Sequence, residues 1–189
     1  MLDVPVKGTH AHSWIMSFPD EYTAFKTYAD LYPNACILLV DTYDTLKSGV
    51  PNAIRVFTEM REAGIKLTSY GIRLDSGDLA YLSKKARKML DAAGFPDAVI
   101  SASNDLDEYL IDSLKAQGAT ITSWGVGTHM ITAKDNPSFG GVYKLAAIMN
   151  PDGTFTPKIK LSENTAKVTN PGNKTVYRWY YSTDKTQVL

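Results

Sequence analysis

Short apolar runs alternate with amphipathic helical patterns over most of the chain. Residues 36–40 (CILLV) form a continuous apolar run, which predicts a strand buried on both faces. After a polar corner, Pro51 suits the first turn of a helix, and Gly64 suits its end. The apolar stripe of this helix is expected at Ala53, Val56, Phe57 and Met60. The pattern therefore predicts one strand–corner–helix unit.

The same unit is predicted twice more, and a fourth strand follows. The further strands are expected at residues 68–74, 98–102 and 120–124, with helices that end near Ala93 and Gly118. Strands and helices that alternate at about thirty-residue spacing predict βαβ units. The fold class is therefore expected to be α/β, with a parallel sheet or barrel.

Both ends of the chain depart from this rhythm. Residues 4–7 predict a short strand, and residues 20–32 a helix with an aromatic core face of Tyr22, Phe25, Tyr28 and either Leu31 or Tyr32. Past Gly140, short strands are expected at 142–149, 158–161 and 176–181, without intervening helices. We therefore expect an α/β portion at residues 1–149 and an irregular β appendage at residues 150–189.

Composition excludes several classes of protein. The 189 residues include 20 basic and 20 acidic side chains, so a neutral chain without a basic run predicts no nucleic-acid partner and no membrane partner. Cys36 is the single cysteine, and residues 1–12 show no secretory pattern. These features predict a cytoplasmic protein.

Polar groups gather in the corners that follow the predicted strands, where active sites of parallel α/β proteins form. These corners contain Thr9-His10-Ala11-His12, Asp41, Arg73 to Asp78, Asn104-Asp105, and Gly125-Val126-Gly127-Thr128. Asp, Asn, Ser and Gly are also the usual turn and N-cap residues. The combination of imidazole, carboxylates, arginine and a glycine corner favours a ligand site.

Each group admits more than one interpretation. Gly125 to Thr128 suits a phosphate nest or a tight turn. Arg73 and Asp75, two apart at a strand end, suit either anion and sugar binding or an internal ion pair. His10 and His12 would share a face of an extended segment, so they could chelate a metal ion. The alternative, which we favour, is that one histidine is catalytic and the other packs in the core. His129 is expected to be exposed. Lys66 or Lys144 would be the amine of a Schiff-base lyase or aldolase.

Read together, the corner motifs resemble nicotinate phosphoribosyltransferases. The resemblance covers residues 7 to about 150, and 158–178 also resemble the C-terminal region of that family. The motifs are GTHAHSW (8–14), LLVDTYDTLKSGVPNAI (38–54), GIRLDSGDLAYLSKKARKML (71–90), SASNDLDEYLI (101–111), WGVGT (124–128) and GGVYKL (140–145). The resemblance implies part of an irregular type II phosphoribosyltransferase α/β barrel, with a small C-terminal β appendage. It also implies transfer of phosphoribosyl from phosphoribosyl diphosphate to nicotinate, coupled to ATP hydrolysis with Mg²⁺, in NAD salvage.

The resemblance also implies roles for individual residues. His12 matches the histidine that ATP phosphorylates, and Asp41 a carboxylate that orients this histidine or a magnesium ion. Asp75 matches the carboxylate near the ribose. The remaining matches are Thr9 and Arg73 for nicotinate, Gly125, Gly127 and Thr128 for the 5-phosphate, and Asn104 and Asp105 for the ribose.

Members of this family are much longer than 189 residues. In them, a ring-stacking aromatic residue and a basic diphosphate-binding segment precede everything that matches here. We therefore expect a fragment that is inactive by itself, and an open sheet edge that favours a homodimer. Alternatives are an enzyme that uses nicotinamide or quinolinate, and a folded piece without catalytic function.

Overall fold

The centre of the structure is a parallel sheet of four strands in the order β1-β2-β3-β4. This computed structural model describes residues 8–132, 142–161 and 168–180, so the strand predicted at residues 4–7 lies outside the described residues. The strands are β1 (Cys36–Leu39), β2 (Tyr70–Leu74), β3 (Val99–Ala102) and β4 (Ser123–Trp124). Each overlaps its predicted range but is shorter. The α/β class with a parallel sheet is confirmed.

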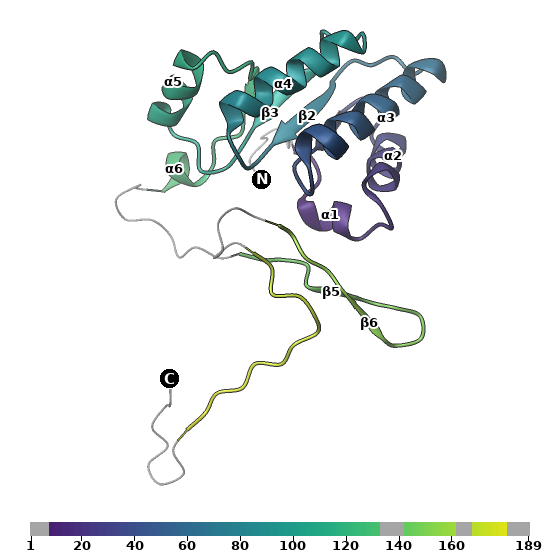
Figure 1. The fold of residues 1–189 in the computed structure, drawn as a ribbon, viewed down its shortest axis with the longest axis vertical. Coiled ribbons are helices and arrows are strands. Elements are labelled where there is room, and N and C mark those ends of the chain that lie inside the picture. The colour runs from purple at the N-terminus through teal and green to yellow at the C-terminus, as the bar shows by residue number, and fades with distance from the viewer. Residues whose placement is uncertain (1–7, 133–141, 162–167, 181–189) are drawn as a thin grey trace, which may run out of the picture.

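Helices cover one face of this sheet. Figure 1 shows α3 and α4 side by side over β2 and β3, with α2 next to α3 and α1 next to α2. An aspartate caps each of four helical segments: Asp20 for α2, Asp44 for η1, Asp78 for α4 and Asp107 for α5. The helical segments are α1 (His12–Met16), α2 (Glu21–Leu31), η1 (Thr45–Gly49), α3 (Val50–Glu62), α4 (Leu79–Ala92), α5 (Glu108–Ala116) and α6 (Thr128–Ile131).

The register of the strands gives the sheet an apolar face and a second face, called the polar face here, on which Arg73 and Ser101 lie beside Ile37 and Val99. Leu38, Ile72 and Ile100 lie in one row across β1, β2 and β3, and all three are fully buried. They share the hydrophobic core with side chains of α3 and α4, such as Phe57 and Leu90. Complete burial of an aliphatic side chain of this size contributes about 1.5–3 kcal/mol. The helices therefore hold the sheet from one side.

The first fifty residues differ from the sequence prediction in three ways. The segment around the two histidines is not extended throughout, because His12 begins α1. Tyr28 is buried as predicted, but Leu31 and Tyr32 are exposed, since small side chains of α2 such as Ala24 complete its core face. The corner after β1 contains the π-helix η1, which the hydrophobic pattern did not predict.

The C-terminal part forms a single hairpin among the described residues. β5 (Ala147–Met149) pairs antiparallel with β6 (Phe155–Pro157), and Gly153 adopts a positive φ of 82° in the turn. The strand predicted at 142–149 is thus shortened, and β6 was not predicted. The strand predicted at 158–161 is wrong, since these residues form no strand. Of the strand predicted at 176–181, residues 176–179 form none, Tyr180 forms a single β-bridge, and residue 181 lies outside the described residues.

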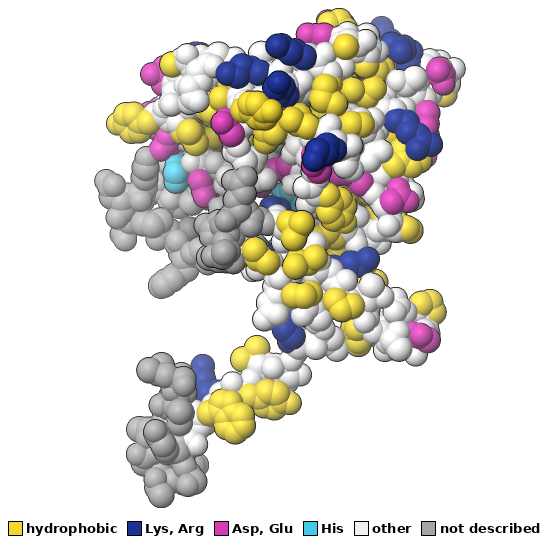
Figure 2. Space-filling view, viewed as in Figure 1, with side chains coloured by type: hydrophobic (Ala, Val, Ile, Leu, Met, Phe, Trp, Pro, Cys, Tyr) yellow, Lys and Arg dark blue, Asp and Glu magenta, His cyan; other side chains and the backbone are white. Residues whose placement is uncertain are grey.

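Apolar side chains remain exposed in this C-terminal part. Figure 2 shows them on the extended segment that leads away from the helices. Val176 is 95% exposed and Trp179 is 74% exposed. In the described part of the chain, no helix combines the length and apolar character needed to span a bilayer.

Substitution of Gly49 tests how closely η1 packs against Val40, the residue that follows β1. A Cβ at Gly49 would lie 1.9 Å from the carbonyl oxygen of Val40, a backbone atom that cannot rotate away. Gly49→Ala should therefore lower the free energy of unfolding by about 1–3 kcal/mol, as overpacking does. Urea unfolding measures this change. Gly8→Ala is the control, because its Cβ would meet nothing within 4 Å; an equal loss in both variants would contradict the packing argument.

Candidate functional site

One histidine and two carboxylates meet beyond the ends of the parallel strands. His12 is the first residue of α1, Asp41 follows β1, and Asp75 follows β2. The Nε2 atom of His12 lies 3.7 Å from Oδ1 of Asp41 and 3.8 Å from Oδ2 of Asp75. Because the carboxyl ends of parallel strands meet at one edge of the sheet, three distant sequence positions converge.

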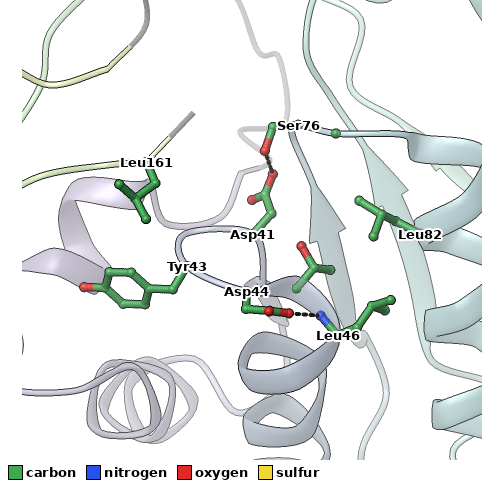
Figure 3. A pocket seen from close by; sticks show the side chains of 9 residues that line it. Asp41, Tyr43, Asp44, Leu46, Ser76, Leu82 and Leu161 are labelled. Atoms are coloured by element: carbon green, nitrogen blue, oxygen red, sulfur yellow. Dashed lines mark hydrogen bonds between the residues drawn. The ribbon is translucent and has the colours of Figure 1, made fainter. Parts of the chain in front are cut away.

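Asp41 is the most deeply buried member of this group, with a side chain that is 2% exposed. Its Oδ2 atom accepts hydrogen bonds from the backbone N–H of Asp75 at 2.9 Å and from the hydroxyl of Ser76 at 2.6 Å (Figure 3). Its Oδ1 atom is buried without a hydrogen-bond partner and faces His12. Asp41 therefore ties the corner after β1 to the corner after β2.

Asp75 is held by the next corner in the sheet. Its Oδ1 atom accepts a short hydrogen bond from the hydroxyl of Ser103, which follows β3. Burial by itself would raise the pKa of this carboxyl, but its contacts with His12 and Ser103 and the charge of Arg73 hold the pKa below its ordinary value. Asp75 is therefore a carboxylate at neutral pH.

The ring of His12 has different surroundings at its two nitrogens. Nδ1 lies 3.0 Å from the hydroxyl oxygen of Thr42, whereas Nε2 faces the two carboxylates. Nε2 is buried and makes no hydrogen bond within the usual distance. The side chain is 15% exposed, so the ring is mostly buried.

His10 does not converge with His12. Its Nε2 atom accepts a hydrogen bond from the backbone N–H of Leu39, and its ring packs edge-on against Tyr28 at 4.7 Å. The two-histidine metal site is therefore not formed, and no group of three or more such side chains among the described residues is arranged to hold a metal ion. Of the two interpretations of this histidine pair, the one with a packing histidine agrees with His10.

Arg73, on the polar face of the sheet, binds the segment that contains His10. Its NH2 group donates a 3.0 Å hydrogen bond to the carbonyl oxygen of His10, while its Nε atom is buried without a partner. Arg73 and Ser101 are register neighbours across β2 and β3, and Ser123 continues the same row in β4. A cationic and hydroxyl-rich face therefore lies opposite the helical layer.

Two cavities flank the cluster of His12, Asp41 and Asp75. The larger, of about 640 Å³, lies on the polar face of the sheet. Thr9, Arg73 and Gly125 line it together with serine and threonine side chains and with the apolar side chains of Ile37, Val99 and Trp124. The smaller, of about 320 Å³, lies between the corners after β1 and β2. Figure 3 shows Tyr43 and Leu161 on one side of it and Leu82 on the other.

Several residues predicted for the site lie outside both cavities. Asn104 and Asp105 are exposed and adopt positive φ angles of 93° and 49°, so they form the turn after β3. Gly127 and Thr128 are exposed at the start of α6. Lys66 is exposed, and neither it nor Lys144 lines a described cavity.

His129 differs from its prediction as an exposed residue. Its Nδ1 atom is buried and lies 3.7 Å from Oδ2 of Asp107. Its side chain is 27% exposed, so it is half-buried beside the N-terminus of α5. This pair links α6 to α5.

Sequence reasoning missed the hydroxyl groups that hold the cluster. Thr42 contacts His12, Ser76 contacts Asp41, and Ser103 contacts Asp75. Each lies in a strand-end corner, and two of them directly follow one of the acids. Because serine and threonine are common in turns, this adjacency becomes informative only when the three corners are known to meet.

Curated relatives match most of the chain. It is 61% identical over 176 residues to nicotinate phosphoribosyltransferase of Bacillus subtilis, covering 93% of this chain and 35% of the relative. It is 40% identical over 224 residues to nicotinate phosphoribosyltransferase of Dictyostelium discoideum, covering 95% of this chain and 37% of the relative. The chain thus spans about a third of the length of these relatives. No family model matches.

Solved structures of similar proteins agree in fold. Human nicotinic acid phosphoribosyltransferase superposes with a TM-score of 0.58 at 27% identity, over 65% of this chain and 35% of the human chain. Nicotinate phosphoribosyltransferase from Porphyromonas gingivalis gives a TM-score of 0.62 at 24% identity, over 87% and 44% of the two chains. The latter match concerns the fold alone.

The buried His10 should make stability depend on pH. Burial, with the charge of Arg73 as a second cause, lowers the pKa of His10 from 6.5 to about 4. Between these values the unfolded chain binds a proton that the folded chain does not, so stability falls as the pH is lowered. The loss between pH 7 and pH 5 is about 2 kcal/mol.

Urea unfolding of the wild type and of His10→Gln at both pH values measures this contribution. The glutamine variant should lose about 2 kcal/mol less than the wild type over this interval. Equal losses in the two proteins would show that His10 is not the group responsible.

Proposed function

We propose that this chain, which is homologous over most of its length to nicotinate phosphoribosyltransferases, forms the phosphoryl-accepting and sugar-binding part of such an enzyme. The observation that carries this proposal is the position of His12 between Asp41 and Asp75, whose partner Ser103 lines the larger cavity together with Arg73. The reaction forms a bond between the ring nitrogen of nicotinate and C1 of phosphoribosyl diphosphate. The bond from C1 to the diphosphate oxygen breaks, and diphosphate leaves.

Arg73 is suited to the carboxylate of nicotinate. One side of its guanidinium is fixed on the carbonyl oxygen of His10, while the buried Nε–H has no partner within the protein. A planar carboxylate satisfies such a donor, and a charge-assisted hydrogen bond there is about twice as strong as a neutral one. Thr9 lines the same cavity, although its hydroxyl already donates to the carbonyl oxygen of Ile37.

Asp75 is suited to the sugar. As C1 loses diphosphate, positive charge develops on the ribose ring, and a fixed carboxylate stabilises that charge. The hydrogen bond from Ser103 holds Asp75 in place before the reaction, so no reorganisation is needed. Gly125, Gly127 and Thr128 would bind the 5-phosphate through backbone N–H groups, and Asn104 and Asp105 would contact the ribose hydroxyls.

His12 is suited to accept the γ-phosphoryl group of ATP. A ring nitrogen attacks phosphorus, ADP leaves, and hydrolysis of the phosphohistidine then drives the unfavourable transfer. Asp41 and Asp75 stabilise the positive ring during attack. The described residues do not form a magnesium site of their own, since no group of three ligands among them is arranged to hold a metal ion. Mg²⁺ would arrive with the phosphates of its substrates.

The polar face of the sheet supports the proposed barrel. Strands of parallel sheets are normally covered on both faces. Here one face packs on helices, while the face with Arg73, Ser101 and Ser123 borders the larger cavity. We therefore infer that the four strands are part of an irregular type II phosphoribosyltransferase barrel, with this polar face directed into its interior.

Phosphorylation of His12 is the direct test of this function. In the full-length product of the gene, His12→Ala should abolish the acid-labile label transferred from γ-labelled ATP. It should also uncouple ATP hydrolysis from nicotinate mononucleotide formation. Slow uncoupled transfer should persist, because positioning and charge stabilisation at C1 do not require the phosphoryl group.

The control for that experiment is His10→Gln, which changes the other histidine of the segment. His10→Gln should retain the label if it folds, as circular dichroism would establish. Full labelling of His12→Ala, or loss of label only in folded His10→Gln, would refute the assignment.

Gly127 tests the phosphate corner separately. A Cβ at Gly127 would meet nothing within 4 Å, but its φ of −124° and ψ of −101° lie outside the main regions that residues with a side chain adopt. Gly127→Val should weaken phosphoribosyl diphosphate binding about tenfold, because the valine side chain blocks approach to the backbone and disfavours this backbone conformation. Calorimetry in the full-length protein measures this affinity. An unchanged affinity, with nicotinate binding also unchanged, would show that this corner is only a turn.

A further inference from the structure

We propose that Thr42 is a positioning residue that fixes which nitrogen of His12 reacts. This inference rests on the proposed function, because it concerns the same histidine. Thr42 directly follows Asp41 in the corner after β1, and it is 1% exposed. Its hydroxyl oxygen lies 3.0 Å from Nδ1 of His12. One corner thus supplies the groups that face both nitrogens of the ring.

The two carboxylates determine where the ring proton lies. Nε2 faces Oδ1 of Asp41 and Oδ2 of Asp75, and Oδ1 of Asp41 is a buried acceptor without a donor. A lone pair on Nε2 would point at these negative charges, whereas an N–H group there is attracted by both. The neutral ring therefore carries its proton on Nε2 and its lone pair on Nδ1.

The hydroxyl of Thr42 then acts as the donor to Nδ1. A hydroxyl can donate or accept, and with the ring proton on Nε2 only donation to Nδ1 remains. This hydrogen bond keeps the ring from turning over, which would direct a lone pair at the carboxylates. Thr42 thus presents Nδ1 as the nucleophile, and it does so without taking part in the bond changes itself.

The phosphoryl step balances in this orientation without an external base. Nδ1 attacks the γ-phosphorus, the bond from phosphorus to the bridging oxygen breaks, and ADP leaves with that electron pair. The ring keeps its proton on Nε2 and becomes positively charged beside Asp41 and Asp75. The hydroxyl of Thr42 transfers its hydrogen bond from Nδ1 to a phosphoryl oxygen.

Two substitutions separate the hydroxyl from the shape of the side chain. Thr42→Val keeps the branched shape and removes the hydroxyl, whereas Thr42→Ser keeps the hydroxyl. In the full-length product of the gene, Thr42→Val should slow histidine phosphorylation by γ-labelled ATP at least about tenfold, the rate equivalent of one lost hydrogen bond. Thr42→Ser should stay within about threefold of the wild type.

A measurement without ATP tests the orientation of the ring directly. Two-dimensional ¹⁵N–¹H spectra of the imidazoles distinguish a protonated nitrogen from one that accepts a hydrogen bond and from one that accepts none. The spectra are taken on this 189-residue chain, which has three histidines. The signals of His12 can therefore be assigned by their absence in His12→Gln. We expect Nε2 protonated and Nδ1 hydrogen-bonded in the wild type and in Thr42→Ser, and a changed Nδ1 signal in Thr42→Val.

Each outcome decides the proposal. Equal phosphorylation rates in the wild type and Thr42→Val, or equal losses in both variants, would overturn it, since the hydroxyl would then be irrelevant or only the packing would matter. A protonated Nδ1 in the wild type would overturn it as well. If the wild type accepts no label at all, the proposed function fails, and the spectra alone decide whether Thr42 orients the ring.

Discussion

The parallel register of β1, β2 and β3 is the constraint on which the site depends. Leu39 of β1 is opposite Arg73 of β2, and Arg73 is opposite Ser101 of β3, so the three strands end at nearly the same level. The backbone ladder continues one step further, where Val40 donates to Arg73 and Ser103 donates to Leu74. A shift of one strand by a single residue would turn its buried side chains to the other face and would separate Asp41 from Asp75.

Each ionisable group of the cluster is held by a hydroxyl group from a neighbouring corner. Ser76 fixes Asp41, Ser103 fixes Asp75, and Thr42 contacts His12. A buried carboxylate without such donors would be costly to keep charged, and it would take up a proton instead. The hydrogen bond from Ser103 helps to hold the pKa of Asp75 below its ordinary value, and the hydrogen bonds to both acids fix the direction in which their remaining oxygens point.

The two faces of the sheet serve different purposes. The face with Leu38, Ile72 and Ile100 is buried against helices and supplies stability. The opposite face contains Arg73 and hydroxyl side chains around a cavity of about 640 Å³. Polar side chains on this face contribute little to the core, but they can bind an anionic ligand. The fold thus separates the residues that hold the sheet from those that meet a ligand.

The sequence by itself determined the α/β class, the order of the strands and helices, and the resemblance to nicotinate phosphoribosyltransferases. These features are local, since apolar runs, helical stripes and corner motifs are contained within short stretches of chain. Tertiary structure alone showed that β1, β2 and β3 bring Asp41, Asp75 and Ser103 together. It also showed that His10 and His12 point in different directions, because His12 begins a helix while His10 packs on Tyr28. The spacing of residues in the sequence cannot show in which direction these side chains point, since that depends on packing between segments far apart in the chain.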